Sequence, residues 1–215
     1  MVIRNRLAAL IYRIIAFTGL VTVFQFYWAN FDSFWEAISC FDVEIGVLVM
    51  TILGLEVLFN LIDLRHGVHG MAAGSYMPIS LPVTTFSTLS GILYFSYSIP
   101  SESAPVGTAA IIFHIILLVG PLFDWLFFSE KGSVRVSGAF TALIYPLWFF
   151  LFGYFRTVIW PNAPIHNGYM YAYPFLDFSG PYIVGYSILY FGVALLSVLF
   201  TIFLNNLLAG KFRRL

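Results

Sequence analysis

The sequence predicts an all-α polytopic membrane protein, a bundle of six transmembrane helices, on three observations. Of the 215 residues, 60% are hydrophobic and only 9% are charged, whereas soluble domains carry about a quarter charged residues. The mean hydropathy is +0.91. Six separate stretches are long and apolar enough to cross the roughly 30 Å hydrocarbon layer as helices. This composition excludes a soluble enzyme, a nucleic-acid-binding protein and a disordered chain, and it indicates one domain over residues 1–215.

Each predicted span contains about 20 mostly apolar residues, because an α-helix rises ~1.5 Å per residue. A strand of a membrane barrel would instead show about 10 alternating residues. Arginines precede the first apolar run, as in a signal peptide, but no small-residue cleavage site follows, so we expect a retained helix. The fifth span contains Pro146, which predicts a kink. The predicted spans are residues 7–28, 38–62, 81–99, 106–128, 136–155 and 181–208.

The basic residues predict which side of the membrane each end occupies. Six spans place both termini on one side, and cytoplasmic segments carry an excess of Lys and Arg. The opposite side of the predicted topology carries Arg156 alone. We therefore expect both termini to be cytoplasmic. The basic residues on the terminal side are Arg4, Arg6, Arg65, Lys131, Arg135, Lys211, Arg213 and Arg214.

Three charged residues fall inside the predicted spans near the cytoplasmic side. Arg13 lies in the first span, Glu56 in the second and Asp124 in the fourth, all at a similar depth from the inner surface. A charge at membrane depth is costly and is usually paired inside the bundle. We expect Arg13 to form a structural ion pair with Glu56 or with Asp124.

A second polar cluster is predicted toward the outer end of the bundle. Cys40, Asp42 and Glu44 open the second span, and His114 lies in the outer half of the fourth. Cys40 and Glu44 share a helix face, whereas Asp42 points about 160° away from Glu44. A thiol, an imidazole and a carboxylate are the components of a nucleophile, a base and an orienting group. The alternative is that the histidine and the cysteine are ordinary structural residues.

An ordered series of motifs begins at His114. It continues with Asp-Trp-Leu-Phe-Phe at 124–128, Tyr-Pro-Leu at 145–147 and Tyr-Pro-Phe-Leu-Asp at 173–177, just before the last span. The series resembles the androgen-inducible membrane protein family, and most closely its bacterial branch of small six-helix proteins. This resemblance implies a multi-pass protein of a bacterial cell membrane.

The resemblance also implies an activity, since the animal members of that family are intramembrane hydrolases of fatty acid esters of hydroxy fatty acids. They use a threonine near the start of the second helix and a histidine in the fourth. His114 takes the position of that histidine, while Cys40 falls nearest the threonine and Ser39 is one step away. His114 would then be the general base, and Asp42 or Glu44 could orient it. A carboxylate near Cys40 opposes this, because it raises the pKa of the thiol.

The connection between the last two spans, residues 156–180, is rich in aromatic residues and proline. We expect it to cover the outer mouth of the bundle as a lid; the alternative is an aromatic belt that only sets membrane depth. The lid residues named for this role are Tyr173, Pro174, Phe175 and Asp177.

The sequence therefore leads to two alternative hypotheses for the function: a lipid ester hydrolase, and a non-catalytic lipid-binding or scaffold protein. A small transporter ranks last, because the chain shows no internal repeat. The expected partner is a membrane lipid or acyl chain, with no cofactor and no metal. His66 and His69 could touch a metal, but they lack an evident third ligand. The substrate and the oligomeric state are left open.

Overall fold

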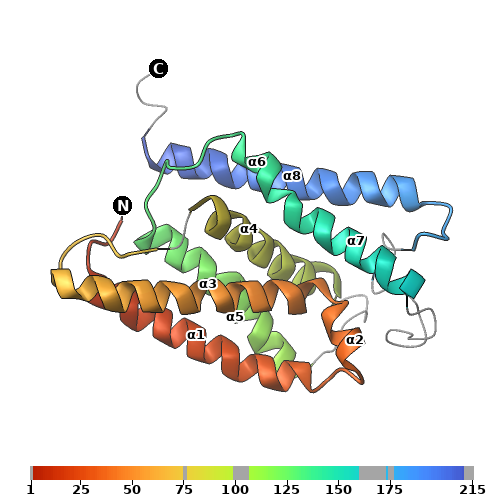
Figure 1. The fold of residues 1–215 in the computed structure, drawn as a ribbon, viewed down its shortest axis with the longest axis horizontal. Helices are drawn as coiled ribbons and strands as arrows, with labels where there is room; N and C mark the ends of the chain where they lie inside the picture. The colour runs from red at the N-terminus through yellow and green to blue at the C-terminus, as the bar shows by residue number, and fades with distance from the viewer. Residues whose placement is uncertain (1, 75–76, 99–106, 160–172, 174–176, 211–215) are drawn as a thin grey trace.

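The computed structural model describes residues 2–74, 77–98, 107–159, 173 and 177–210 (Figure 1). Six helices within these ranges are long and apolar enough to cross a membrane. No strand occurs in the same ranges, apart from an isolated bridge between Asn5 and His69. The prediction of an all-α, six-helix membrane bundle is confirmed.

The described chain contains eight α-helices and two short segments of other helical types. The α-helices are α1 (Arg6–Trp28), α2 (Phe34–Ile38), α3 (Phe41–Asp63), α4 (Met77–Leu93), α5 (Thr108–Phe128), α6 (Gly138–Ala142), α7 (Ile144–Ile159) and α8 (Ile183–Leu208). A 3₁₀ segment, Leu64–His66, extends α3, and a π-helical segment, Tyr94–Ser98, extends α4.

The second span begins three residues later than predicted, because a short helix precedes it. Ser33 caps α2 by accepting a hydrogen bond from the Glu36 backbone N–H at 3.1 Å. The Glu36 carboxylate in turn accepts one from the Asp32 N–H at 2.8 Å. Such reciprocal capping defines a helix start. Cys40 follows α2 in an extended conformation as the N-cap of α3, so it lies outside the span.

The third and fifth spans also differ from their predicted bounds. The third starts at Met77, four residues before the predicted start at residue 81. The fifth is divided by a turn at Leu143 into α6 and α7. This break lies one turn before Pro146, as expected for a proline ring that displaces the preceding turn.

Four helices, α1, α3, α4 and α5, pack closely together, and α6 and α8 pack against α4 (Figure 1). The first turn of α1 and the last turn of α8 lie at one end, here called the terminal end. The other end, where α2 connects α1 to α3, is called the α2 end. Between the ends the core is apolar, and its fully buried side chains include Leu20, Val49, Leu53, Phe86, Phe113 and Leu117.

The packing of α4 on α5 is closest at Gly91. A Cβ atom at this position would lie 2.6 Å from Leu118 Cβ and 3.2 Å from the His114 backbone oxygen. Only glycine fits there without moving a helix. The next turn of α4 brings Tyr94 against His114.

We expect Gly91→Ala to destabilise the protein by about 1–3 kcal/mol, because the added methyl group overpacks the α4–α5 contact. Gly192→Ala is the matched control, since a Cβ there meets nothing within 4 Å. Thermal unfolding of both variants in detergent micelles measures the difference. A melting temperature for Gly91→Ala at or above that of the wild type would contradict the assigned contact.

Candidate functional site

His114 is the centre of the polar cluster at the α2 end. It lies in the second turn of α5 and is 1% exposed. Its Nδ1 is 2.8 Å from the Ala110 carbonyl oxygen. A carbonyl oxygen can only accept a hydrogen bond, so the geometry assigns a proton to Nδ1. This contact fixes the ring orientation and points Nε2 toward α3.

The partner of Nε2 is Asp42, in the first turn of α3. The distance between His114 Nε2 and Asp42 Oδ2 is 3.0 Å, and the Asp42 side chain is 13% exposed. The Tyr27 hydroxyl, from the last turn of α1, donates to the same oxygen. The other oxygen, Oδ1, accepts a hydrogen bond from the Val43 N–H at 3.1 Å. Three helices thus contribute to one buried carboxylate–imidazole pair.

Two tyrosine rings enclose the imidazole. Tyr94 stacks on His114 with ring centroids 3.5 Å apart and an interplanar angle of 2°. Tyr27 contacts the imidazole edge-on, at 5.4 Å and 86°. Tyr94 is the first residue of the π-helical segment, and such segments are frequent at functional sites. The rings exclude bulk water, which strengthens the electrostatic interaction between His114 and Asp42.

The pair has a definite proton count. A 3.0 Å contact between Nε2 and Oδ2 requires one proton between them, since two lone pairs would repel. Together with the proton on Nδ1, this makes either an imidazolium facing a carboxylate or a neutral imidazole facing a carboxylic acid. In both arrangements one proton lies between Nε2 and Oδ2, and either group can carry it.

The two nucleophile candidates from the sequence face away from the imidazole. Ser39 Oγ donates to the Trp35 carbonyl at 2.6 Å, and Cys40 Sγ lies 3.6 Å from the Glu36 carbonyl. Within the described residues no hydrogen bond joins either side chain to His114. Burial raises the pKa of the Cys40 thiol well above its usual value, and the carboxylates of Asp42 and Glu36 raise it further. The thiol is therefore protonated at neutral pH.

Glu44 is also separate from the imidazole. It is half-buried two residues along α3 from Asp42, and it faces Tyr145 of α7. Between Asp42 and Glu44, the two carboxylates proposed to orient His114, the structure brings only Asp42 to the ring.

The predicted lid is described in part. Tyr173 lies over the start of α3, where its hydroxyl accepts a hydrogen bond from the Phe41 N–H at 3.1 Å. Asp177 Oδ1 accepts hydrogen bonds from the Ser179 N–H at 3.1 Å and hydroxyl at 2.6 Å, and so closes a turn before α8. Pro174 and Phe175 lie outside the described residues, as does most of the segment 156–180. The lid stays a prediction.

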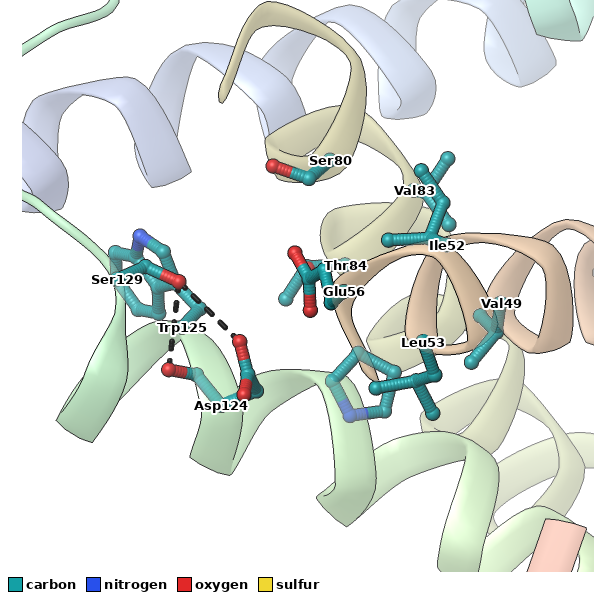
Figure 2. Close-up of a pocket in the computed structure, with 11 residues that line it drawn as sticks. Val49, Ile52, Leu53, Glu56, Ser80, Val83, Thr84, Asp124, Trp125 and Ser129 are labelled. Carbon is teal, nitrogen blue, oxygen red and sulfur yellow. Dashed lines mark hydrogen bonds between the residues drawn. The ribbon is translucent and has the colours of Figure 1, made fainter. Parts of the chain in front are cut away.

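At the terminal end, Arg13 contacts both of the carboxylates expected from the sequence. It binds Asp124 through two hydrogen bonds, Nε to Oδ1 at 2.7 Å and Nη2 to Oδ2 at 3.0 Å. Glu56 Oε2 lies 3.5 Å from the same Nε. Arg13 is 0% exposed. Ser129 also donates to Asp124, as Figure 2 shows.

Tyr27 and Tyr94 are the site residues that the sequence analysis missed. Consecutive spans are antiparallel, so the end of α1 and the start of α3 meet at the same membrane depth. That rule would have placed Tyr27 near Asp42. Tyr94 carries no comparable signal, because its direction depends on the π-helical segment.

No protein-family model, no curated protein and no solved structure matches this chain. In the described part of the chain, no group of three or more His, Cys, Asp or Glu residues is arranged to hold a metal ion. The class of the protein follows from the six apolar helices and from the contact between His114 and Asp42. It is an integral multi-pass membrane protein with a buried carboxylate–imidazole pair.

We expect Cys40 to react with a maleimide only at pH values well above 9, because its raised pKa keeps the thiol protonated below that. The control is Ser179→Cys in a Cys40→Ala background, since Ser179 is exposed near the same end of the bundle. Its labelling rate should rise around the ordinary thiol pKa of about 8.5. Equal pH profiles for the two cysteines would contradict the raised pKa.

Proposed function

We propose that this protein is an intramembrane hydrolase of lipid esters in which Asp42 and His114 move the proton. The observation that carries the proposal is the 3.0 Å contact between Nε2 and Oδ2, buried inside a membrane-spanning bundle. A buried pair of titratable side chains in hydrogen-bond contact is a candidate catalytic centre. The motif resemblance to a family of intramembrane ester hydrolases supports the same class, with His114 at the family's histidine position.

The proposed nucleophile is a water molecule and not Cys40, whose thiol is protonated at neutral pH. In the reactive form the proton between Nε2 and Oδ2 has left, so Asp42 is ionised and His114 carries a proton on Nδ1 only. The attacking water lies between the two groups, which are then farther apart than 3.0 Å. The pair accepts one proton from water as the water oxygen attacks the ester carbonyl carbon. It returns that proton to the alkoxide oxygen when the carbon–oxygen bond of the tetrahedral intermediate breaks. The products are a carboxylic acid and an alcohol, and the pair is restored.

The position of the pair suits a substrate that arrives from the bilayer. The bundle exposes many large apolar side chains around the spans, as a lipid-facing surface requires. The basic residues at the terminal end favour a cytoplasmic location for that end. We therefore place Asp42 and His114 in the outer half of a bacterial cell membrane, with both termini in the cytoplasm.

One observation favours the second candidate, a non-catalytic lipid-binding or scaffold protein. Both ring nitrogens of His114 already have partners, Ala110 and Asp42. A structural histidine would show the same geometry. In that case Asp42, Tyr27 and His114 would only fix the positions of α1, α3 and α5.

Hydrolysis of p-nitrophenyl esters with acyl chains of 8 to 16 carbons, assayed in proteoliposomes, separates the two candidates. We expect Asp42→Asn and His114→Gln to lower the rate about 10²–10⁴-fold, the usual contribution of general acid–base catalysis. Cys40→Ala and Glu44→Gln should retain the wild-type rate within about threefold, since neither residue contacts His114.

Melting temperatures of the same variants exclude unfolding as the cause of a lost rate. Wild-type protein that releases no more p-nitrophenol than empty vesicles, at every chain length, would reject the hydrolase and leave the scaffold. Rejection would also follow if His114→Gln were folded and fully active.

A further inference from the structure

One oxygen of Asp42, Oδ2, receives two side-chain contacts from different helices. The Tyr27 hydroxyl of α1 donates a hydrogen bond to it, and Nε2 of His114 in α5 lies 3.0 Å away. An ionised carboxylate oxygen can accept both hydrogen bonds. In a carboxylic acid with its proton on Oδ2, that oxygen would donate to Nε2 and would have less capacity left to accept from the phenol. The two contacts together therefore favour an ionised Asp42.

The other contacts of the pair favour the same charges. The second carboxylate oxygen, Oδ1, accepts a hydrogen bond from the Val43 N–H at 3.1 Å. Asp42 also lies in the first turn of α3, where the helix dipole stabilises a negative charge. On the other side, Tyr94 stacks on the imidazole at 3.5 Å, and an aromatic face attracts a cation. Among the described residues no lysine or arginine forms an ion pair with Asp42.

Burial opposes a charged pair, because both groups lose their contact with water. The side chains of His114 and Asp42 are 1% and 13% exposed. A hydrogen bond to an ionised carboxylate is charge-assisted and about twice as strong as one between neutral groups. The Tyr27 hydroxyl therefore stabilises ionised Asp42 more than the neutral acid, and it replaces part of the lost hydration. Of the two possible arrangements of the shared proton, this favours the one with the proton on Nε2.

The position of the Tyr27 hydroxyl is fixed by contacts of its ring. Tyr27 is 1% exposed. Its ring stacks on Phe113, with centroids 4.5 Å apart and an interplanar angle of 12°, and it meets Phe31 edge-on at 5.3 Å and 88°. None of these ring contacts involves the hydroxyl. Tyr27→Phe would therefore keep the packing of α1 on α5 and remove only the hydrogen bond to Asp42.

We propose that Tyr27 is a positioning residue of the proposed hydrolase, which keeps Asp42 ionised and the shared proton on His114 Nε2. His114 is then an imidazolium in the protein without substrate, with a proton on each ring nitrogen. In the reactive form, when that proton has left and water lies between the two groups, the phenol still holds the Asp42 carboxylate in place. The effect on the rate rests on the proposed hydrolase, whereas the position of the shared proton does not.

Nitrogen NMR of the full-length protein in detergent micelles measures the position of this proton. Replacement of His66, His69 and His166 by glutamine leaves His114 as the only histidine to carry the ¹⁵N label. An imidazolium gives two similar nitrogen chemical shifts, and a neutral imidazole gives two widely separated ones. We expect similar shifts at neutral pH in this background. Tyr27→Phe should separate them, because the loss of one hydrogen bond to a charged group shifts the ratio of the two arrangements about 10- to 100-fold.

Tyr12→Phe is the matched control. The Tyr12 hydroxyl also connects α1 to α5, where it donates to the Gly120 carbonyl at 2.7 Å, but it contacts neither Asp42 nor His114. We expect the imidazolium spectrum to be unchanged in Tyr12→Phe. The comparison separates an effect on the shared proton from a general effect of a lost hydroxyl between the same two helices.

Ester hydrolysis in proteoliposomes tests the effect on the rate. Tyr27→Phe should lower kcat about 10- to 100-fold and leave KM within about twofold of the wild type, because the phenol acts through Asp42. Tyr12→Phe should retain the wild-type kcat.

A neutral imidazole in the background protein with Tyr27 intact would overturn the proposal without any change at position 27. An imidazolium spectrum and an unchanged kcat in folded Tyr27→Phe would overturn it as well. Absence of any ester hydrolysis by the wild type would instead reject the hydrolase, and with it the effect of Tyr27 on the rate. The nitrogen spectra would still decide where the shared proton lies.

Discussion

The bilayer offers almost no water to a buried charge, and this constraint explains where the polar residues of the structure lie. Arg13, at 0% exposure, contacts two carboxylates. Asp42 accepts hydrogen bonds from an imidazole, a phenol and a backbone N–H. Removal of one partner from such a group would leave an uncompensated buried charge, at a cost of about 3–5 kcal/mol. The pairs therefore specify which helix faces meet, in an environment where apolar side chains gain little by leaving lipid.

Helix α3 connects the two polar clusters. Asp42 in its first turn belongs to the α2 end, and Glu56 belongs to the terminal end. Val49 and Leu53 lie between them on the helix and are almost fully buried. One face of the helix thus carries a polar residue toward each end and apolar residues between them.

Much of the fold could be predicted from the sequence, because each membrane span depends on the hydropathy of about 20 consecutive residues. The membrane depth of each charged residue could be predicted as well. The similar depths of Arg13, Glu56 and Asp124 indicated that the arginine would pair with one of the two carboxylates. The rotation of a helix about its own axis could not be predicted, because it depends on neighbours that are distant in the sequence. Asp42 and Glu44 were both expected at about the membrane depth of His114. Only the packing of α3 against α5 brings Asp42, and not Glu44, to the imidazole.

Local changes in helix geometry also limited what could be predicted about the candidate site. The capped helix α2 moved Cys40 out of the span and turned its thiol toward a carbonyl. The π-helical segment directed Tyr94 onto the imidazole. Both devices depend on a few backbone hydrogen bonds that hydropathy does not record.

The ion pair of Arg13 also constrains how the chain is assembled. Asp124 follows Arg13 by 111 positions, so α1 enters the bilayer long before α5 has been synthesised. Until then only Glu56 of α3 offers it a carboxylate, at the longer distance of 3.5 Å, and the guanidinium otherwise reaches water by extending along α1 toward the membrane surface. The first helix to enter the bilayer therefore reaches its final depth late. It does so when α5, the fourth span, inserts and Asp124 binds Arg13.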